Sequence, residues 1–175
     1  MSRTLLAMQP IDGISKRTNP HRFKKHVEHH RKLEKLRRKE LIMSKIGSWI
    51  EPSSRLSNTL VKDYFHCIKQ MVKLMGYHFK KHQVTTIIYC DLYINKTNKI
   101  RESQLFHLLL MSTILSLKFW EDYGVDSELV EEISLIPKKE MCRMEKDFLS
   151  VLDYSLYIPN TDIETLAANT ILPAV

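Results

Sequence analysis

The 175-residue sequence contains few of the residues that interrupt regular structure, with only four glycines and six prolines. An all-β fold needs many tight turns, and these depend on the backbone angles that glycine and proline supply. The sequence still has 43% hydrophobic residues, which is enough to build a core. We therefore predict an all-α protein with one domain and an extension.

Cysteines and long hydrophobic runs are also scarce. Cys67, Cys90 and Cys142 are far apart and form no CxxC pair. Each falls in an apolar helical pattern, so we expect buried, reduced thiols rather than disulfides, zinc ligands or nucleophiles. No run of about 18 apolar residues is free of charge or strong polarity, and residues 1–10 lack the core of a signal peptide. We expect an intracellular protein, nuclear or cytoplasmic, with no membrane partner.

Signals of catalysis are missing as well. No glycine-rich phosphate loop, GxSxG, HExxH or kinase catalytic-loop pattern occurs. The acids at 121–122 and 131–132 are adjacent, and adjacent residues on a helix point in different directions, so neither pair is a natural acid–base dyad. His26 and His30 have the spacing of two metal ligands, but no cysteine or pair of carboxylates completes a site. We expect no enzyme, no metal site and no cofactor.

The charge is divided unevenly along the chain. Residues 1–50 contain thirteen lysines and arginines against four acids, a net charge of +9, whereas residues 51–175 carry −2. After turn signals in residues 1–20, which we expect to be poorly ordered, residues 21–50 predict a basic helix that docks one edge on the body. A solvated basic face is the simpler interpretation, and contact with nucleic acid or an acidic partner is the alternative. The residues for such a contact are Arg22, Lys24, Lys25, Arg31, Lys32, Arg37 and Arg38.

Five further helical segments follow a polar break at residues 51–54. The first is capped by Ser57 or Asn58 and ends near Gly76. The second covers about 83–96, where several β-branched residues make a strand a rival interpretation. The third covers 103–122, the fourth 127–134, and the fifth 138–152, with Pro137 in its first turn.

The segment from 103 to 122 is apolar on nearly every side, so a protein must bury it centrally. Ser112 and Ser116 are four residues apart and would share one face, where a neighbouring helix could approach closely. Lys118 follows near its end. A lysine suits a helix C-terminus, where the dipole is negative, but it could also face outward to grip a partner.

Glu145 lies midway along the fifth segment, flanked by Arg143 and Lys146. Its neighbours at a spacing of four are Met141 and Leu149, neither of which can pair with a carboxylate. No local salt bridge at that spacing is therefore available, and the charge is left for a distant partner.

Two stretches, HLLLMSTILSLKFWED and PKKEMCRMEKDFLSVLDYSLYIP, resemble the third and fifth helices of a cyclin box. The resemblance covers roughly residues 57–160. It is closest to the short single-box cyclins of the P/U type, because the 15 residues after Asn160 are too few for a second five-helix repeat. Its strongest matches are Ser112, Ser116, Lys118-Phe119, Glu121-Asp122, Arg143-Met144-Glu145, Leu149, Leu152, Tyr154 and Leu156.

The resemblance implies a five-helix cyclin box at 57–160, preceded by an additional basic N-terminal helix and followed by a tail at 161–175. It implies a regulatory subunit that binds and activates a cyclin-dependent protein kinase, for example in the cell cycle, with no chemistry of its own. It assigns Lys118 and Glu145 to the pair that cyclins present to the kinase backbone near its mobile αC helix. The other kinase-binding positions are Phe119, Glu121, Leu149, Tyr154 and Leu156.

The chain also departs from the cyclin pattern. Ser116 stands where alanine is usual, and the first helix lacks the MRAIL-type motif with which mitotic cyclins recruit RxL substrates. Two alternative functions stay open. One is a nucleic-acid-binding protein of the same fold, as in transcription factors of the IIB type, that uses the basic helix. The other is a scaffold that binds a kinase without activating it.

Overall fold

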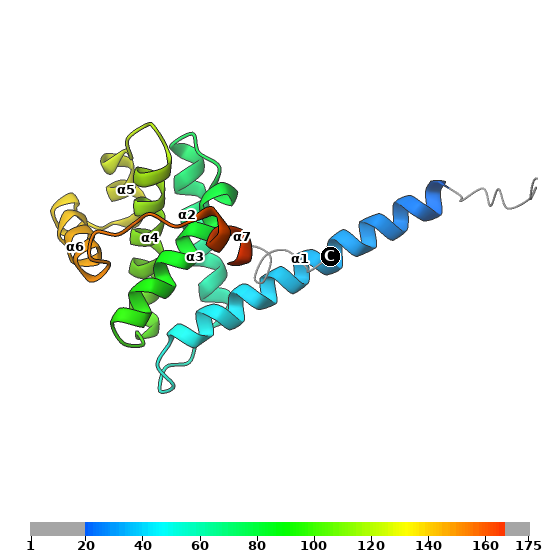
Figure 1. Cartoon of the computed structure of the whole chain (residues 1–175), viewed down its shortest axis with the longest axis horizontal. Helices are drawn as coiled ribbons and strands as arrows, with labels where there is room; N and C mark the ends of the chain where they lie inside the picture. The colour runs from blue at the N-terminus through cyan, green and yellow to red at the C-terminus, as the bar shows by residue number, and fades with distance from the viewer. Residues whose placement is uncertain (1–19, 167–175) are drawn as a thin grey trace, which may run out of the picture. The chain divides into compact units, whose positions relative to one another are not determined.

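The computed structural model describes residues 20–166 (Figure 1). The chain divides into two compact units, residues 1–36 and residues 37–175, and the first helix has residues in both. The predicted poorly ordered segment lies outside the described residues except for Pro20, and so does the predicted tail from residue 167 onward.

The described residues form helices and no strand, which confirms the all-α prediction. None of the helices within this range is both long and apolar enough to cross a lipid bilayer. The elements are α1 (Pro20–Trp49), α2 (Asn58–Leu74), α3 (Phe79–Lys96), the 3-10 turn η1 (Glu102–Gln104), α4 (Leu105–Trp120), α5 (Ser127–Ser134), α6 (Lys138–Val151) and α7 (Asn160–Leu166).

The helix bounds correct several predictions. Helix α3 begins at Phe79 rather than 83, because Phe79 and His82 are buried and the helix continues through them. The predicted segment 103–122 is divided between η1 and α4. The Gln104 side chain accepts a hydrogen bond from the backbone N–H of Arg101, just before η1. Helix α4 ends at Trp120, and the backbone of Glu121 is extended. Pro137 caps α6 from outside instead of lying in its first turn. Helix α7 was not predicted.

Ser57 occupies the predicted N-cap of α2 but makes no side-chain bond to the helix backbone. Its hydroxyl instead pairs with that of Thr59 at 2.6 Å. The strand considered for residues 83–96 is excluded, because α3 covers all of them.

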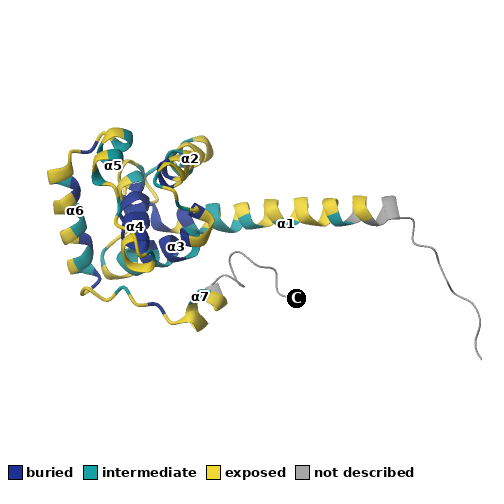
Figure 2. Cartoon of the chain, turned by 90° about the horizontal axis from the view of Figure 1, so that it is seen from above, coloured by how far each residue is buried: buried dark blue, intermediate teal, exposed yellow. Residues whose placement is uncertain are grey.

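Helix α4 lies at the centre of the unit, surrounded by α2, α3, α5 and α6 (Figure 2). Every residue from Leu108 to Leu117 is buried. The two small residues face α3 as predicted: Cys90 Sγ lies 3.1 Å from Ser112 Oγ, and the Thr85 hydroxyl is hydrogen-bonded to that of Ser116. Small side chains allow the two helices to approach closely, so α3 and α4 form the inner layer of the fold.

The end of α1 packs into the core of the second unit through residues that the sequence analysis did not single out. Ile46 and Trp49 are almost fully buried. The indole N–H of Trp49 donates to one Asp91 oxygen, and the Lys45 ammonium contacts the other, both at 2.6 Å. The buried part of this helix is therefore its last turns. Leu33, earlier in the same helix, is half exposed.

The cysteine prediction is right for one residue and wrong for another. Cys90 is buried, and burial raises the pKa of its thiol to about 12. Cys67 is half-buried, whereas Cys142 is exposed. Helix α6 buries only a narrow stripe of residues that includes Met141 and Phe148. Cys142 follows Met141 directly and therefore points away from this stripe.

Candidate partner-binding site

Lys118 and Glu145 come from different helices and meet at the surface. The Lys118 ammonium lies 2.7 Å from both oxygens of the Glu145 carboxylate. The side chain of Lys118 is 43% exposed and that of Glu145 is 21% exposed. Lys118 lies in the last turn of α4, where the negative end of the helix dipole favours a cation. The fold thus presents an ion pair on the rim of an apolar core.

The ion pair lies between apolar side chains. A cavity of about 60 Å³ beside it is lined by both charged residues and by apolar residues of α4, α5 and α6. Met111, Ile114 and Met141 supply part of this lining and are themselves buried. The elements that carry the two charges are therefore fixed by core packing and not by the ion pair alone.

Two aromatic residues follow Lys118 directly. Phe119 is 42% exposed and Trp120 is 37% exposed, and their rings meet edge to face with centroids 5.1 Å apart. The Trp120 indole donates to the Tyr89 hydroxyl at 3.1 Å, and that hydroxyl donates to the carbonyl of Leu156 at 2.7 Å. Burial raises the pKa of Tyr89 to about 12, so this phenol stays protonated and can donate. The bonds hold the end of α4 against the segment after α6.

The remaining predicted residues of this set differ in their surroundings. Leu149 and Leu156 are half-buried against the core, and Tyr154 is exposed. Tyr154 has a left-handed backbone (φ 57°), and its N–H bonds to the carbonyl of Leu149 at 2.8 Å. Glu121 turns inward, where one carboxylate oxygen lies 2.8 Å from Nε2 of His82.

The basic residues predicted for nucleic-acid contact belong to α1. Lys24, Lys25, Arg31, Lys32 and Arg37 are exposed, whereas Arg38 is half-buried with an Nε that has no hydrogen-bond partner. The side chain of Arg22 is outside the described residues. These residues are separate in sequence from the Lys118–Glu145 pair and form a second candidate surface.

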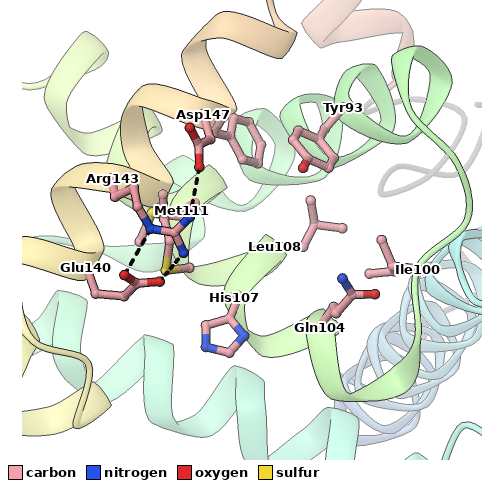
Figure 3. Close-up of a pocket in the computed structure, with 11 residues that line it drawn as sticks. Tyr93, Ile100, Gln104, His107, Leu108, Met111, Glu140, Arg143 and Asp147 are labelled. Carbon is pink, nitrogen blue, oxygen red and sulfur yellow. Dashed lines mark hydrogen bonds and ion pairs between the residues drawn. The ribbon is translucent and has the colours of Figure 1, made fainter.

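A larger cavity, of about 370 Å³, lies on another side of α6 (Figure 3). Arg143 lines this cavity, and its guanidinium donates to the two Glu140 carboxylate oxygens at 2.5 and 3.0 Å. The same guanidinium forms an ion pair with an Asp147 oxygen 3.6 Å away. The guanidinium lowers the pKa of Glu140. Residues 140, 143 and 147 share one side of the helix, and Glu145 points to a different side. The cavity is therefore distinct from the ion pair. The described residues contain no group of three side chains that could hold a metal ion.

Sequence reasoning missed the residues that hold the candidate surface in place. Tyr89 and Trp120 were not assigned a role, and His82 was left outside the second predicted helix. His82 and Thr85 lie among polar residues such as Lys81 and Gln83, so the sequence carried no signal for a buried polar cluster there.

We expect the Lys118–Glu145 pair to contribute little to stability, because both side chains reach solvent and exposed ion pairs contribute about 0–1 kcal/mol. A double-mutant cycle with Lys118→Ala and Glu145→Ala, followed by urea unfolding, should give a coupling free energy below about 1 kcal/mol. A coupling of about 3 kcal/mol or more would instead mark the pair as a structural element of the core.

The comparisons with known proteins bear on this geometry. A protein-family model described as Cyclin matches residues 15–156, which is most of the chain. The comparisons with curated proteins and with solved structures found no significant match. The matched range contains the whole central helix bundle and both members of the surface ion pair. The chain belongs to the cyclin family.

Proposed function

We propose that this chain is the regulatory subunit of a cyclin-dependent protein kinase, which it binds and activates without chemistry of its own. The observation that carries the proposal is the ion pair between Lys118 and Glu145, 27 residues apart in sequence and joined at 2.7 Å beside exposed aromatic rings. Membership of the cyclin family supports the same role. The resemblance to cyclins of the P/U type is part of this proposal.

The pair retains hydrogen-bonding capacity for a partner. An ammonium has three hydrogens, and a carboxylate accepts several bonds, so neither group is saturated by the other. Lys118 can donate to a backbone carbonyl of the kinase while Glu145 accepts from a backbone N–H. Because core packing already orients both helices, less side-chain freedom is lost when the complex forms.

The apolar residues around the pair supply the rest of the proposed surface. Phe119 in α4 and Tyr154 after α6 are exposed. Leu149 in α6 and Leu156 after it are half-buried. A rigid apolar surface with a few polar anchors can hold the αC helix of a kinase inward, so that the lysine–glutamate pair of the kinase forms. Glu121, bonded to His82, would act by holding this surface in place.

We further propose that residues 57–160 form the kinase-binding box and that residues 21–50 are an accessory helix. The complex would act in the nucleus or cytoplasm, for example in cell-cycle control. The bounds are supported by the packing of α2 to α6 around α4. No cofactor is required by this role.

The double variant Lys118→Ala with Glu145→Ala should lose about 30-fold or more in affinity for its kinase, because truncating desolvated polar anchors typically costs ~2–5 kcal/mol. The measurement is calorimetric or pulldown binding, together with a kinase assay. The matched control is Glu140→Ala with Arg143→Ala, which removes another ion pair on another side of α6. This control should bind as the parent chain does.

Equal binding and activation by the double variant and the parent would contradict the interface. A parent chain that binds the kinase with the expected variant sensitivity but leaves the kinase inactive would identify a non-activating scaffold, the alternative within the same binding mode.

Nucleic-acid binding is a second candidate function, and the exposed basic side chains of α1 favour it. Replacing Lys24, Lys25, Arg31 and Lys32 by glutamine should then weaken binding to DNA or RNA and flatten its salt dependence, because fewer counterions are released. The measurement is fluorescence anisotropy at several salt concentrations. As a control, the same replacement of the exposed Lys62, Lys69, Lys73 and Lys80 should have a smaller effect. Absence of binding by the parent chain at low salt would exclude this function.

A further inference from the structure

A buried histidine joins α3 to the end of α4. His82 is only 3% exposed, and both of its ring nitrogens have polar partners. Its Nδ1 lies 3.1 Å from Ser116 Oγ, and its Nε2 lies 2.8 Å from a Glu121 oxygen. Thr85 completes the cluster: its hydroxyl donates to the carbonyl of His82 at 2.9 Å and is also hydrogen-bonded to the Ser116 hydroxyl. Ser116 is fully buried, so no substrate can reach this cluster, and we assign it no hydrolytic role.

The direction of each hydrogen bond in the cluster can be assigned by counting hydrogens. Thr85 uses its only hydroxyl hydrogen on the carbonyl of His82, so the hydrogen between Thr85 and Ser116 must come from Ser116. The hydrogen between Ser116 and His82 must then come from Nδ1. The ionised Glu121 only accepts, so Nε2 also carries a hydrogen. All four contacts form together only when the imidazole holds both hydrogens and is positively charged.

The neutral ring is one hydrogen short. It supplies one N–H, and the two hydroxyls supply one hydrogen each, which leaves one of the four contacts without a donor hydrogen. In a buried cluster, an unmade hydrogen bond costs more than in water. The extra proton belongs on the ring because imidazole is a much stronger base than a carboxylate.

The cluster acts on the segment that bears the candidate surface. Glu121 directly follows Trp120, and its backbone N–H bonds to the carbonyl of Leu117 as the C-cap of α4. The next residues are held by the Tyr77 hydroxyl, which donates to the carbonyl of Tyr123 at 2.8 Å. Loss of the bond between His82 and Glu121 would release one of the two anchors of this turn.

We propose that doubly protonated His82 is a positioning residue that fixes the end of α4, with Phe119 and Trp120, in the conformation that meets the partner. The protonation state is a property of the isolated chain. The effect on partner affinity rests on the proposed kinase-binding function.

Few other titratable groups face this cluster. Glu121 is the charged group that contacts the ring, and α4 contributes only the Ser116 hydroxyl. Partial burial, then the charges of Glu121 and Tyr123, raise the pKa of Tyr77, so this phenol stays neutral near pH 7.

The protonation is tested by ¹⁵N NMR of the histidine rings in the full chain near pH 7, with His82 assigned by its absence in His82→Gln. We expect two protonated ring nitrogens for His82. One protonated and one bare nitrogen would overturn the proposal. Thr85→Val is the matched variant: without the Thr85 hydroxyl, Ser116 can donate to a neutral ring, so we expect one protonated and one bare ring nitrogen for His82 under the same conditions.

The positioning role is tested by kinase affinity in two variants of equal polarity. The glutamine amide of His82→Gln can reach the position of Nε2 and keep the bond to Glu121, whereas the shorter His82→Asn can reach only the position of Nδ1. We expect His82→Asn to lose about tenfold in affinity and His82→Gln to stay within about threefold of the parent.

Equal affinity of the two variants would overturn the positioning role. A parent that binds no kinase would remove the proposed function, while the NMR result would still decide the protonation of His82.

Discussion

Burial of α4 is the constraint on which the rest of the structure depends. Ten successive residues of this helix, Leu108 to Leu117, are buried, which requires helices on all of its sides. Its C-terminal turn reaches the surface, so the residues there, Lys118 to Trp120, are presented by a helix that core packing holds in place. A partner that recognises them meets groups whose positions are set before it binds. In the proposed function, such preset groups would let a regulatory subunit act on a kinase.

The same helix also carries the polar groups that link its interior to its exposed end. Small side chains let α3 approach α4, but a serine in a buried helix pair brings a hydroxyl that needs partners. Ser112 finds Cys90, and Ser116 finds Thr85 and His82. The second cluster continues to Glu121 at the helix end. Contiguous hydrogen bonds therefore join the polar interior of the α3–α4 pair to the exposed end of α4.

The helices and the ion pair could be predicted from the sequence because their signals are local or carried by recurring motifs. Hydrophobic spacing marked five segments, and the resemblance to a cyclin box singled out Lys118 and Glu145 as a pair. The contacts of Trp49 with Asp91 and of His82 with Glu121 join residues about forty positions apart and leave no periodic pattern. Helix ends also resisted prediction, because the start of α3 is decided by burial of Phe79 against other helices. The role of the pair in binding stays a prediction.

The central claim is that the ion pair faces a partner, and exchanging its charges tests this most directly. The variant with Lys118→Glu and Glu145→Lys can rebuild an ion pair within the chain but presents each charge to the wrong kinase group. Calorimetric titration of the parent and this variant with the kinase, at matched thermal stability, measures the difference. The account predicts that the variant folds as the parent does and loses at least about 30-fold in affinity. Binding at parental affinity would show that the pair serves only the fold, and would contradict the account.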